Sequence, residues 1–348
     1  MTVAAISPQP AAMTSNLTIA QQLLWLGQKL APDSPLYNMA FLFTLTGEIK
    51  PVHFQAAFQA LVQRSDALRM VIEDVDGVAQ RRVLSELDYE VAVLDFSAHG
   101  DPHAAARVWA QRHSQTLFNL SERLFETALI RLGADCYTWY LNQHHVITDI
   151  QSVQHIYKIL GNFYRRSVEG TLAQAPVLPS YGDITLPSPS SRTIDYWQQQ
   201  QANSVDLYHR TAPQVSARTR RVFCELGLGK TAALKQLAIT SPAQALTPQL
   251  SLFNLVAGIL LAYLHRVSGS ERVAFATPTH GRPTAALKET IGIFVELFPL
   301  QAEIDPGETF ASLLRKVSDA SGGLLRYAQP GASQSAPSRQ VNVELNFI

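Results

Sequence analysis

Residues 136–149 are CYTWYLNQHHVITD, an apolar run that ends in two adjacent histidines and, four residues after the second, an aspartate. The aromatic residues predict a strand over 136–143, which follows a strand predicted over 126–132. We expect the chain to leave the sheet at the histidines. One imidazole can then enter a cleft while the other packs behind it, and Asp149 can hold the turn.

Taken alone, this run fits a structural role as well as a catalytic one. Two histidines and one aspartate are also possible zinc ligands. However, adjacent residues of a strand point to opposite faces, and no third His or Glu has suitable spacing. We therefore predict no metal site.

The residues before this run predict alternating helices and strands. Thr18 and Gln21 form a capping box at the start of a helix, and Pro51 favours the first turn of a second helix. Asp76-Gly77 predicts a hairpin turn. The other predicted elements are strands over 39–46, 68–75 and 78–84, and a helix over 104–118; a further helix follows Asp149.

The chain changes character between residues 170 and 191, where four prolines stand among Ser and Gly. We predict a lobe boundary there and an α+β architecture in two lobes. The predicted parts are a disordered leader (1–15), an N-terminal lobe (16–175), a linker (176–192) and a C-terminal lobe (193–348). In the second lobe we expect helices over 250–266 and 309–327, and strands over 272–277, 294–304 and 340–348.

Composition excludes several classes of protein. Lys plus Arg equals Asp plus Glu, 28 each in 348 residues, so no net field favours nucleic acid or an acidic membrane. The apolar run 250–264 is too short to span a bilayer and predicts a buried helix. Cys136 and Cys224 form no CxxC pair, so a reducing, cytoplasmic compartment is expected.

Other motifs do not hold. Residues 227–231, GLGKT, imitate the end of a phosphate-binding loop, but Cys224 stands where that motif needs Gly. They predict a helix start with a solvated Lys230. The sequence has neither Gly-x-Ser-x-Gly nor His-Glu-x-x-His, so a serine hydrolase or a zinc protease is unsupported.

Six segments together resemble the condensation domains of nonribosomal peptide synthetases, relatives of chloramphenicol acetyltransferase. Residues 143–152 are similar to that family's His-His-x-x-x-Asp-Gly core. The other matching segments are 17–26 (LTIAQQLLWL), 64–69 (RSDALR), 181–184 (YGDI), 277–283 (TPTHGRP) and 291–296 (IGIFVE). The order and intervals of the six matches make the resemblance far more specific than any single motif.

The resemblance implies a two-lobed chloramphenicol acetyltransferase-like fold of mixed sheets flanked by helices, and a role for each matching site residue. His145 corresponds to the active-site histidine, and His144 supports it by packing or a hydrogen bond. Asp149 and Arg282 correspond to a buried ion pair that shapes the site. Arg69 is expected to be structural.

The implied activity is amide formation, in which an amine attacks a carrier-bound acyl or aminoacyl thioester. The partners would be donor and acceptor carrier proteins, whose phosphopantetheine arms hold the substrates, and neighbouring synthetase domains. The domain itself is expected to bind no cofactor. His145 would lie in a tunnel between the lobes with a carrier docked at each mouth.

Three departures leave alternatives open. Ile150 replaces the motif's Gly, which predicts a changed backbone conformation or a narrowed channel. Glu296 replaces an Asn and could line the channel and raise the pKa of His145. The chain ends in its last predicted strand, so the second lobe is expected to be truncated. A catalytically silent carrier-binding module and an O-acyltransferase that forms esters are the alternatives.

Overall fold

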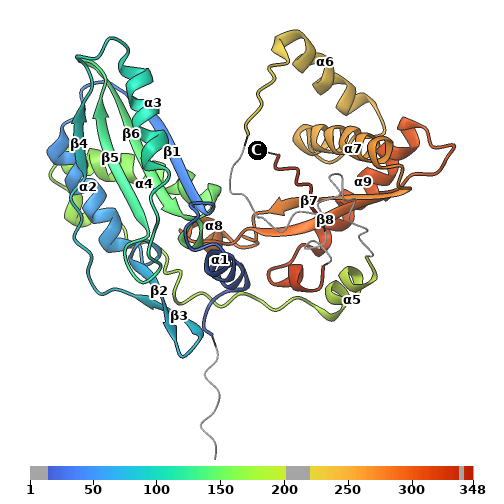
Figure 1. The fold of residues 1–348 in the computed structure, drawn as a ribbon, viewed down its shortest axis with the longest axis horizontal. Coiled ribbons are helices and arrows are strands. Elements are labelled where there is room, and N and C mark those ends of the chain that lie inside the picture. Colours follow the sequence, from blue (N-terminus) through green and yellow to red (C-terminus); the bar gives the residue numbers. More distant parts are fainter. Residues whose placement is uncertain (1–14, 201–219, 337–340, 348) are drawn as a thin grey trace, which may run out of the picture. The chain divides into compact units, whose positions relative to one another are not determined.

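The computed structural model describes residues 15–200, 220–336 and 341–347, which form two compact units (Figure 1). The first unit contains residues Met1–Ile184 and Glu289–Ile293, and the second contains Thr185–Lys288 and Phe294–Ile348. The division after Ile184 falls in the Pro-rich stretch. The short return of Glu289–Ile293 to the first unit has no counterpart in the predicted lobes. Apart from Ser15, the predicted leader lies outside the described residues.

The first unit is built on a four-stranded sheet of order β1-β6-β5-β4. The strands are β1 (Asn38–Thr46), β4 (Ala92–Asp95), β5 (Phe125–Arg131) and β6 (Cys136–His144). β6 is antiparallel to both of its neighbours, and β4 is parallel to β5. The hairpin of β2 (Met70–Val75) and β3 (Val78–Val83) forms a separate sheet.

Helices cover both faces of this sheet (Figure 1). Trp139 contacts Phe54 of α2 (Pro51–Arg64) and Tyr157 of α4 (Ile150–Val168) on one face. The next residue, Tyr140, contacts Trp109 of α3 (Pro102–His113) on the other face. β6 is therefore buried on both sides, which accounts for its continuous apolar sequence.

Local sequence signals explain where these elements begin. The capping box of Thr18 and Gln21 opens α1 (Ile19–Leu30), as predicted. Asp76 and Gly77 take positive φ values of 53° and 81° in the β2–β3 turn. α3 begins earlier than predicted because Asp101 caps it, with its carboxylate accepting from the Ala104 amide. It also ends five residues earlier than predicted, at a turn that Thr116 closes on the His113 carbonyl.

The second unit packs two long helices on a two-stranded antiparallel sheet. The strands are β7 (Arg272–Thr279) and β8 (Glu296–Glu303), and the helices are α7 (Pro248–Ser268) and α9 (Phe310–Tyr327). Their buried core includes Phe253, Leu261, Phe275, Leu300 and Val317. At the chain end, where the sequence predicts a strand over 340–348, the described residues 341–347 make one parallel bridge, Ala276 to Glu344.

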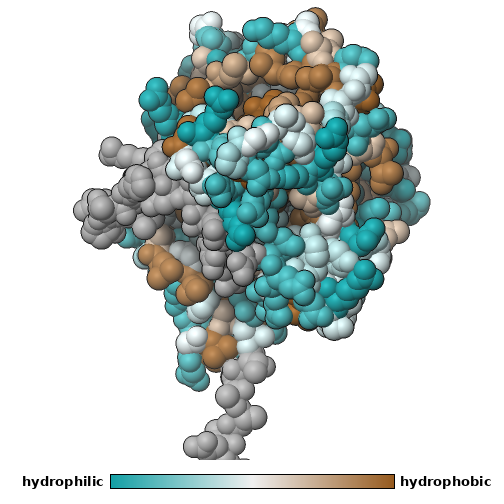
Figure 2. Space-filling view, turned by 90° about the vertical axis from the view of Figure 1, so that its right-hand side faces the viewer, coloured by the Kyte–Doolittle hydropathy of each residue, from teal (hydrophilic) through white to brown (hydrophobic). Residues whose placement is uncertain are grey.

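Shorter helices complete the unit: α5 (Ser191–Gln199), α6 (Gly227–Thr240) and α8 (Ala285–Glu289), whose last residue belongs to the first unit. Residues 227–231 form the first turn of α6, and Lys230 is exposed as predicted. Hydrophobic residues, brown in Figure 2, also reach the surface.

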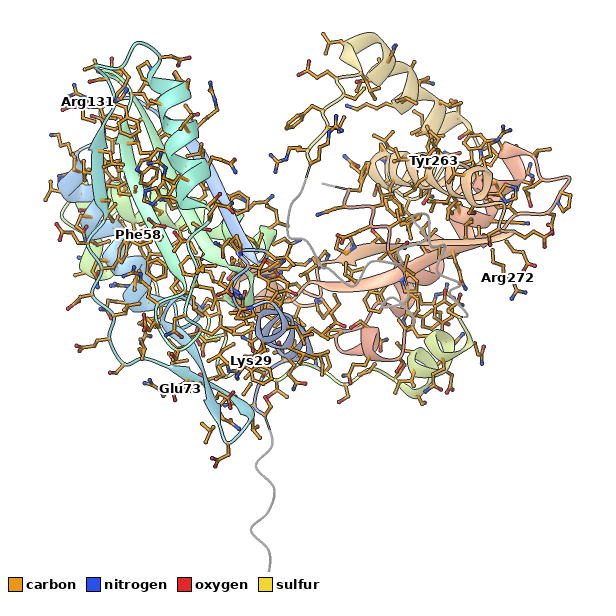
Figure 3. All side chains as sticks on the ribbon, viewed as in Figure 1. Lys29, Phe58, Glu73, Arg131, Tyr263 and Arg272 are labelled. Carbon is orange, nitrogen blue, oxygen red and sulfur yellow. The ribbon has the colours of Figure 1, made fainter. Side chains whose placement is uncertain are left out.

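Among the described residues, α7 is the one helix long and apolar enough to cross a membrane by length and composition. It extends beyond the predicted 250–266 because Thr247 caps its start and Gly269 ends it in the left-handed conformation. Eight of its residues are buried within the second unit, while Tyr263, labelled in Figure 3, is exposed.

Candidate active site

The two histidines lie where β6 ends and the chain turns into α4. His144 is the last residue of β6, and residues His145–Ile147 form a single 3-10 turn. The His145 amide donates to the Tyr37 carbonyl at 2.7 Å, just before β1. Asp149 then caps α4 by accepting from the Ser152 amide at 2.9 Å. The chain thus leaves the sheet at the histidines, as the sequence predicts.

The ring of His145 is held by one nitrogen. Its Nδ1 lies 2.7 Å from the Thr148 carbonyl oxygen, which can only accept, so in this contact Nδ1 carries the proton. In the neutral ring, Nε2 then has the lone pair, and no described residue forms a hydrogen bond with it. His145 is partly exposed, whereas its neighbours from His144 to Asp149 are buried. The turn therefore presents a potential base at Nε2.

His144 is a neutral ring in the core. Its Nδ1 accepts from the Val146 amide at 3.2 Å, so the proton lies on Nε2, which is 3.3 Å from the Gln28 side-chain oxygen. The edges of Tyr37 and Phe118 contact the ring. Burial, and secondarily the neighbouring His145, lowers the pKa of His144 to about 4. At neutral pH it is therefore an uncharged support for the turn.

Ile150 occupies the first position of α4, directly after the cap. Among the described residues the only non-glycine residue with positive φ is Asp76, so the backbone at Ile150 is one that any L-residue adopts. The substitution therefore causes no left-handed strain at Ile150, and the predicted change of backbone conformation stays untested. The predicted narrowing of a channel stays a prediction.

Side chains distant in sequence support the turn, and sequence reasoning missed this role for them. The Gln21 side chain is fully buried, and its Nε2 donates to the Val146 carbonyl at 3.1 Å. The sequence identifies Gln21 only as a capping residue. The one available signal was the segment beginning Leu17-Thr18, which resembles the same family as the histidine motif. Local spacing in the sequence does not connect Gln21 with residue 146.

Arg282 lies in the second unit, in the turn that follows β7. It is 1% exposed, its guanidinium carbon lies 4.3 Å from the ring centre of Phe294, and its backbone amide donates to Nδ1 of His280 at 3.1 Å. Gly281 between them has φ +59°, and a Cβ there would lie 2.0 Å from the Phe294 carbonyl oxygen. Asp149 and Arg282 belong to different units, and their ion pair stays a prediction.

Glu296 begins β8 and is bound within its own unit. Its carboxylate accepts from the Gly331 amide at 2.6 Å and from the Ser333 amide and hydroxyl at 3.2 and 2.5 Å. These contacts give Glu296 a structural task that sequence reasoning missed. A carboxylate can accept all three bonds, whereas an Asn amide presents one acceptor oxygen. Its predicted place in a channel near His145 is untested.

The described residues contain no group of three or more His, Cys, Asp or Glu placed to hold a metal ion. The histidine turn itself offers the imidazole of His145 beside buried backbone amides and carbonyls. Such a ring can accept a proton from a nucleophile and return it to a leaving group.

Comparison with known proteins points to one family. Residues 12–332 match the family model described as condensation domain. The chain is 27% identical over 341 residues to cyclosporin synthetase simA of Tolypocladium inflatum, covering 93% of this chain and 2% of that protein. It is 29% identical over 321 residues to phosphinothricin tripeptide synthetase PhsC of Streptomyces viridochromogenes, covering 86% of this chain and 28% of PhsC. The chain thus spans a small part of these relatives.

Solved structures agree. A mutant of the starter condensation domain of rhizomide synthetase RzmA, in complex with C8-CoA, has a TM-score of 0.78 at 25% identity, covering 96% of this chain and 78% of the other. The first condensation domain of the calcium-dependent antibiotic synthetase has a TM-score of 0.74 at 23% identity and 96% coverage of this chain, 81% of the other. These likenesses confirm the predicted fold class.

Proposed function

This chain belongs to the condensation domain family, and on that basis we propose that it forms an amide bond by transferring a carrier-bound acyl or aminoacyl group to an amine. The donor and acceptor would arrive on the phosphopantetheine arms of two carrier proteins or domains. The observation that carries the proposal is the geometry of His145, whose Nδ1 is bound to the Thr148 carbonyl and whose Nε2 has the lone pair.

The reaction needs a neutral amine. An α-amino group has a pKa near 7.7–8.0 and is mostly protonated at pH 7, so it is the neutral fraction that attacks, and its nitrogen must lose one further proton as the amide forms. In our proposal the amine nitrogen attacks the thioester carbonyl carbon while His145 Nε2 accepts a proton from that nitrogen. The tetrahedral intermediate then expels the phosphopantetheine thiolate, which the imidazolium protonates, and the amide remains.

Base catalysis and positioning both contribute. Proton transfer by a correctly positioned side chain typically raises the rate by about 10²–10⁴-fold. Holding the two reactants in the right orientation raises the rate further. The partly exposed His145 ring, fixed at Nδ1 on a buried turn, fits both tasks. We assign His144, Asp149 and Arg282 to support of the site, with Ile150 and Glu296 as candidates for lining the channel.

The cellular setting follows from the same proposal. Cys136 and Cys224 are both free thiols, which is compatible with the reducing cytoplasm in which we propose that the chain acts. The domain would need no cofactor of its own, since the phosphopantetheine belongs to the carriers.

Intact-protein mass spectrometry tests the proposal. The chain is mixed with a donor carrier bearing an acyl or aminoacyl thioester and an acceptor carrier bearing an aminoacyl group. We expect the acceptor to gain the donor mass through a base-stable amide in the wild type, and to gain it far more slowly with His145→Ala. A base-labile ester on a hydroxyl substrate would indicate an O-acyltransferase. Carrier binding without transfer would indicate a silent module.

A further inference from the structure

Residues 291–293 are fastened to the first turn of α4 by the Ser152 hydroxyl. Ser152 Oγ donates to the Gly292 carbonyl at 2.6 Å and accepts from the Gly292 amide at 3.0 Å. Ser152 is 0% exposed, and Ile291 and Ile293 are each 3% exposed. One hydroxyl thus satisfies both polar groups of a buried residue that is 140 positions away in sequence.

Tyr181 also contacts residues 291–293, through its hydroxyl and its ring. Its hydroxyl donates to the Ile293 carbonyl at 2.8 Å. Its ring lies so close to Gly292 that a Cβ at that position would come within 2.0 Å of a ring carbon. Asp66 fixes Tyr181 in turn, because its carboxylate accepts from the Tyr181 amide at 2.9 Å and the Gly182 amide at 2.6 Å.

The first turn of α4, which Ser152 bonds to Gly292, directly follows the residues that hold the ring of His145. The Ser152 amide donates to the Asp149 carboxylate, and Thr148, the residue before Asp149, supplies the carbonyl that binds His145 Nδ1. Thr148, Asp149 and Ser152 are all at most 2% exposed. Rotation of the first turn of α4 would therefore move the Thr148 carbonyl and release the ring.

We propose that Ser152 and Tyr181 are positioning residues for His145: they clamp residues 291–293 against the first turn of α4, and this clamp holds the Thr148 carbonyl that orients the imidazole. The expected effect of these residues on the reaction rate rests on the proposed function. The tautomer that the clamp maintains is a property of the ring that needs no substrate.

The test uses the full chain with two variants that break the clamp at different atoms, Ser152→Ala and Tyr181→Phe. Two matched controls lie farther along α4. Ser167→Ala removes a serine hydroxyl that pairs with His53 at 3.0 Å, and Tyr164→Phe removes a tyrosine hydroxyl that accepts from the Lys50 amide at 3.0 Å. Each control removes the same hydroxyl group as its clamp variant and loses one hydrogen bond that does not involve residues 291–293.

The first measurement is nitrogen-15 NMR of the histidine rings above pH 7, where the neutral tautomers are resolved. We expect the His145 ring to carry its proton on Nδ1 in the wild type and in both controls, and to populate both tautomers in Ser152→Ala and Tyr181→Phe. The second measurement is the single-turnover rate at saturating carriers. We expect a loss of about tenfold or more in the clamp variants, since small misplacements are costly in rate, and a change within about twofold in the controls.

The double variant shows whether Ser152 and Tyr181 act together on the His145 turn or independently of each other. If both side chains act on the same three residues, the loss in the double variant will be smaller than the product of the two single losses. Wild-type tautomer and rate in both clamp variants would overturn the inference. Should Ser152→Ala fail to fold, Tyr181→Phe alone decides by the same criteria. A tautomer change in a chain without transferase activity would support the clamp while refuting the proposed function.

Discussion

Two turns at strand ends share a hydrogen bond from a backbone amide to the Nδ1 of a histidine two residues earlier. They differ in the residue that follows that histidine. After β6, His144 Nδ1 accepts the amide of residue 146 at 3.2 Å; after β7, His280 Nδ1 accepts the amide of residue 282 at 3.1 Å. The next residue is His145 in the first turn and Gly281 in the second. His145 has room for a partly exposed ring, whereas the Phe294 carbonyl fills the space beside Gly281.

Because of this difference, the first turn exposes a side chain that can react, whereas the second turn packs into a hydrophobic core. In the first turn the capping histidine is buried and its neighbour is accessible. In the second the capping histidine is exposed, and Arg282 is buried over Phe294. Changes in the first turn should therefore alter rate and proton binding, and changes in the second should alter stability. Four experiments test this contrast.

The largest effect is expected for His145→Ala. Loss of a general base and of the ring's positioning should lower the single-turnover rate by about 10²–10⁴-fold, while the melting temperature changes little because the ring is partly exposed. His155→Ala on α4 is the control and should keep the wild-type rate. A wild-type rate in His145→Ala would remove this turn from the chemistry.

Gly281→Ala tests the second turn. The left-handed φ of +59° costs an alanine about 1–2 kcal/mol, and the 2.0 Å approach to the Phe294 carbonyl adds about 1–3 kcal/mol of crowding. Gly269→Ala is the matched control, because it has φ +68° with nothing within 4 Å and should show the strain alone. Urea unfolding measures both. Equal losses in the two variants would mean that the turn is not closed by packing.

The pH dependence of stability reports on His144. Its pKa is about 4 in the folded chain and near 6.5 when unfolded, so below pH 6.5 the unfolded state binds a proton that the folded state does not. Stability should fall as the pH drops from 6.5 towards 4, by up to about 3 kcal/mol. The slope should flatten in His144→Asn. An unchanged slope in that variant would assign the acid sensitivity to other groups.

The smallest effect is expected for Glu296→Gln. The amide replaces one acceptor oxygen by a donor facing the Gly331 and Ser333 donors, which should cost about 1–3 kcal/mol of unfolding free energy. Glu303→Gln is the control in the same strand, since its exposed pair with Arg272 at 3.4 Å is worth about 0–1 kcal/mol (Figure 3 labels Arg272). If the rate falls while stability is kept, Glu296 acts on the channel instead.

Local signals in the sequence predicted most of the first unit's fold. The capping box at Thr18, Pro51 and the Asp76-Gly77 turn are set by neighbouring residues, so their elements appear where expected. β4 was missed because it is short and lies at the edge of its sheet, with three of its four residues exposed. Only the start of α6 was predicted, at residues 227–231; its extent was missed because its apolar residues show no single face, as the exposure of Leu228 and Leu237 indicates.

The sequence names residues for the candidate site, whose roles stay predictions, but it does not give their geometry. The motif identified His144, His145 and Asp149, whereas the tautomer of each ring depends on a carbonyl or an amide that only the folded backbone supplies. The contact of Ser152 with Gly292 joins residues 140 positions apart, and no periodic pattern encodes such a pair.

The return of Glu289–Ile293 to the first unit matters for engineering. A fragment cut only in the Pro-rich linker would lose these residues, and with them the hydrogen bonds of Gly292 to Ser152 and of Ile293 to Tyr181, and would expose apolar surface. Fragment complementation or chimeric assembly from this chain should therefore keep 289–293 with residues 15–184, for example through a short Gly-Ser graft after Ile184.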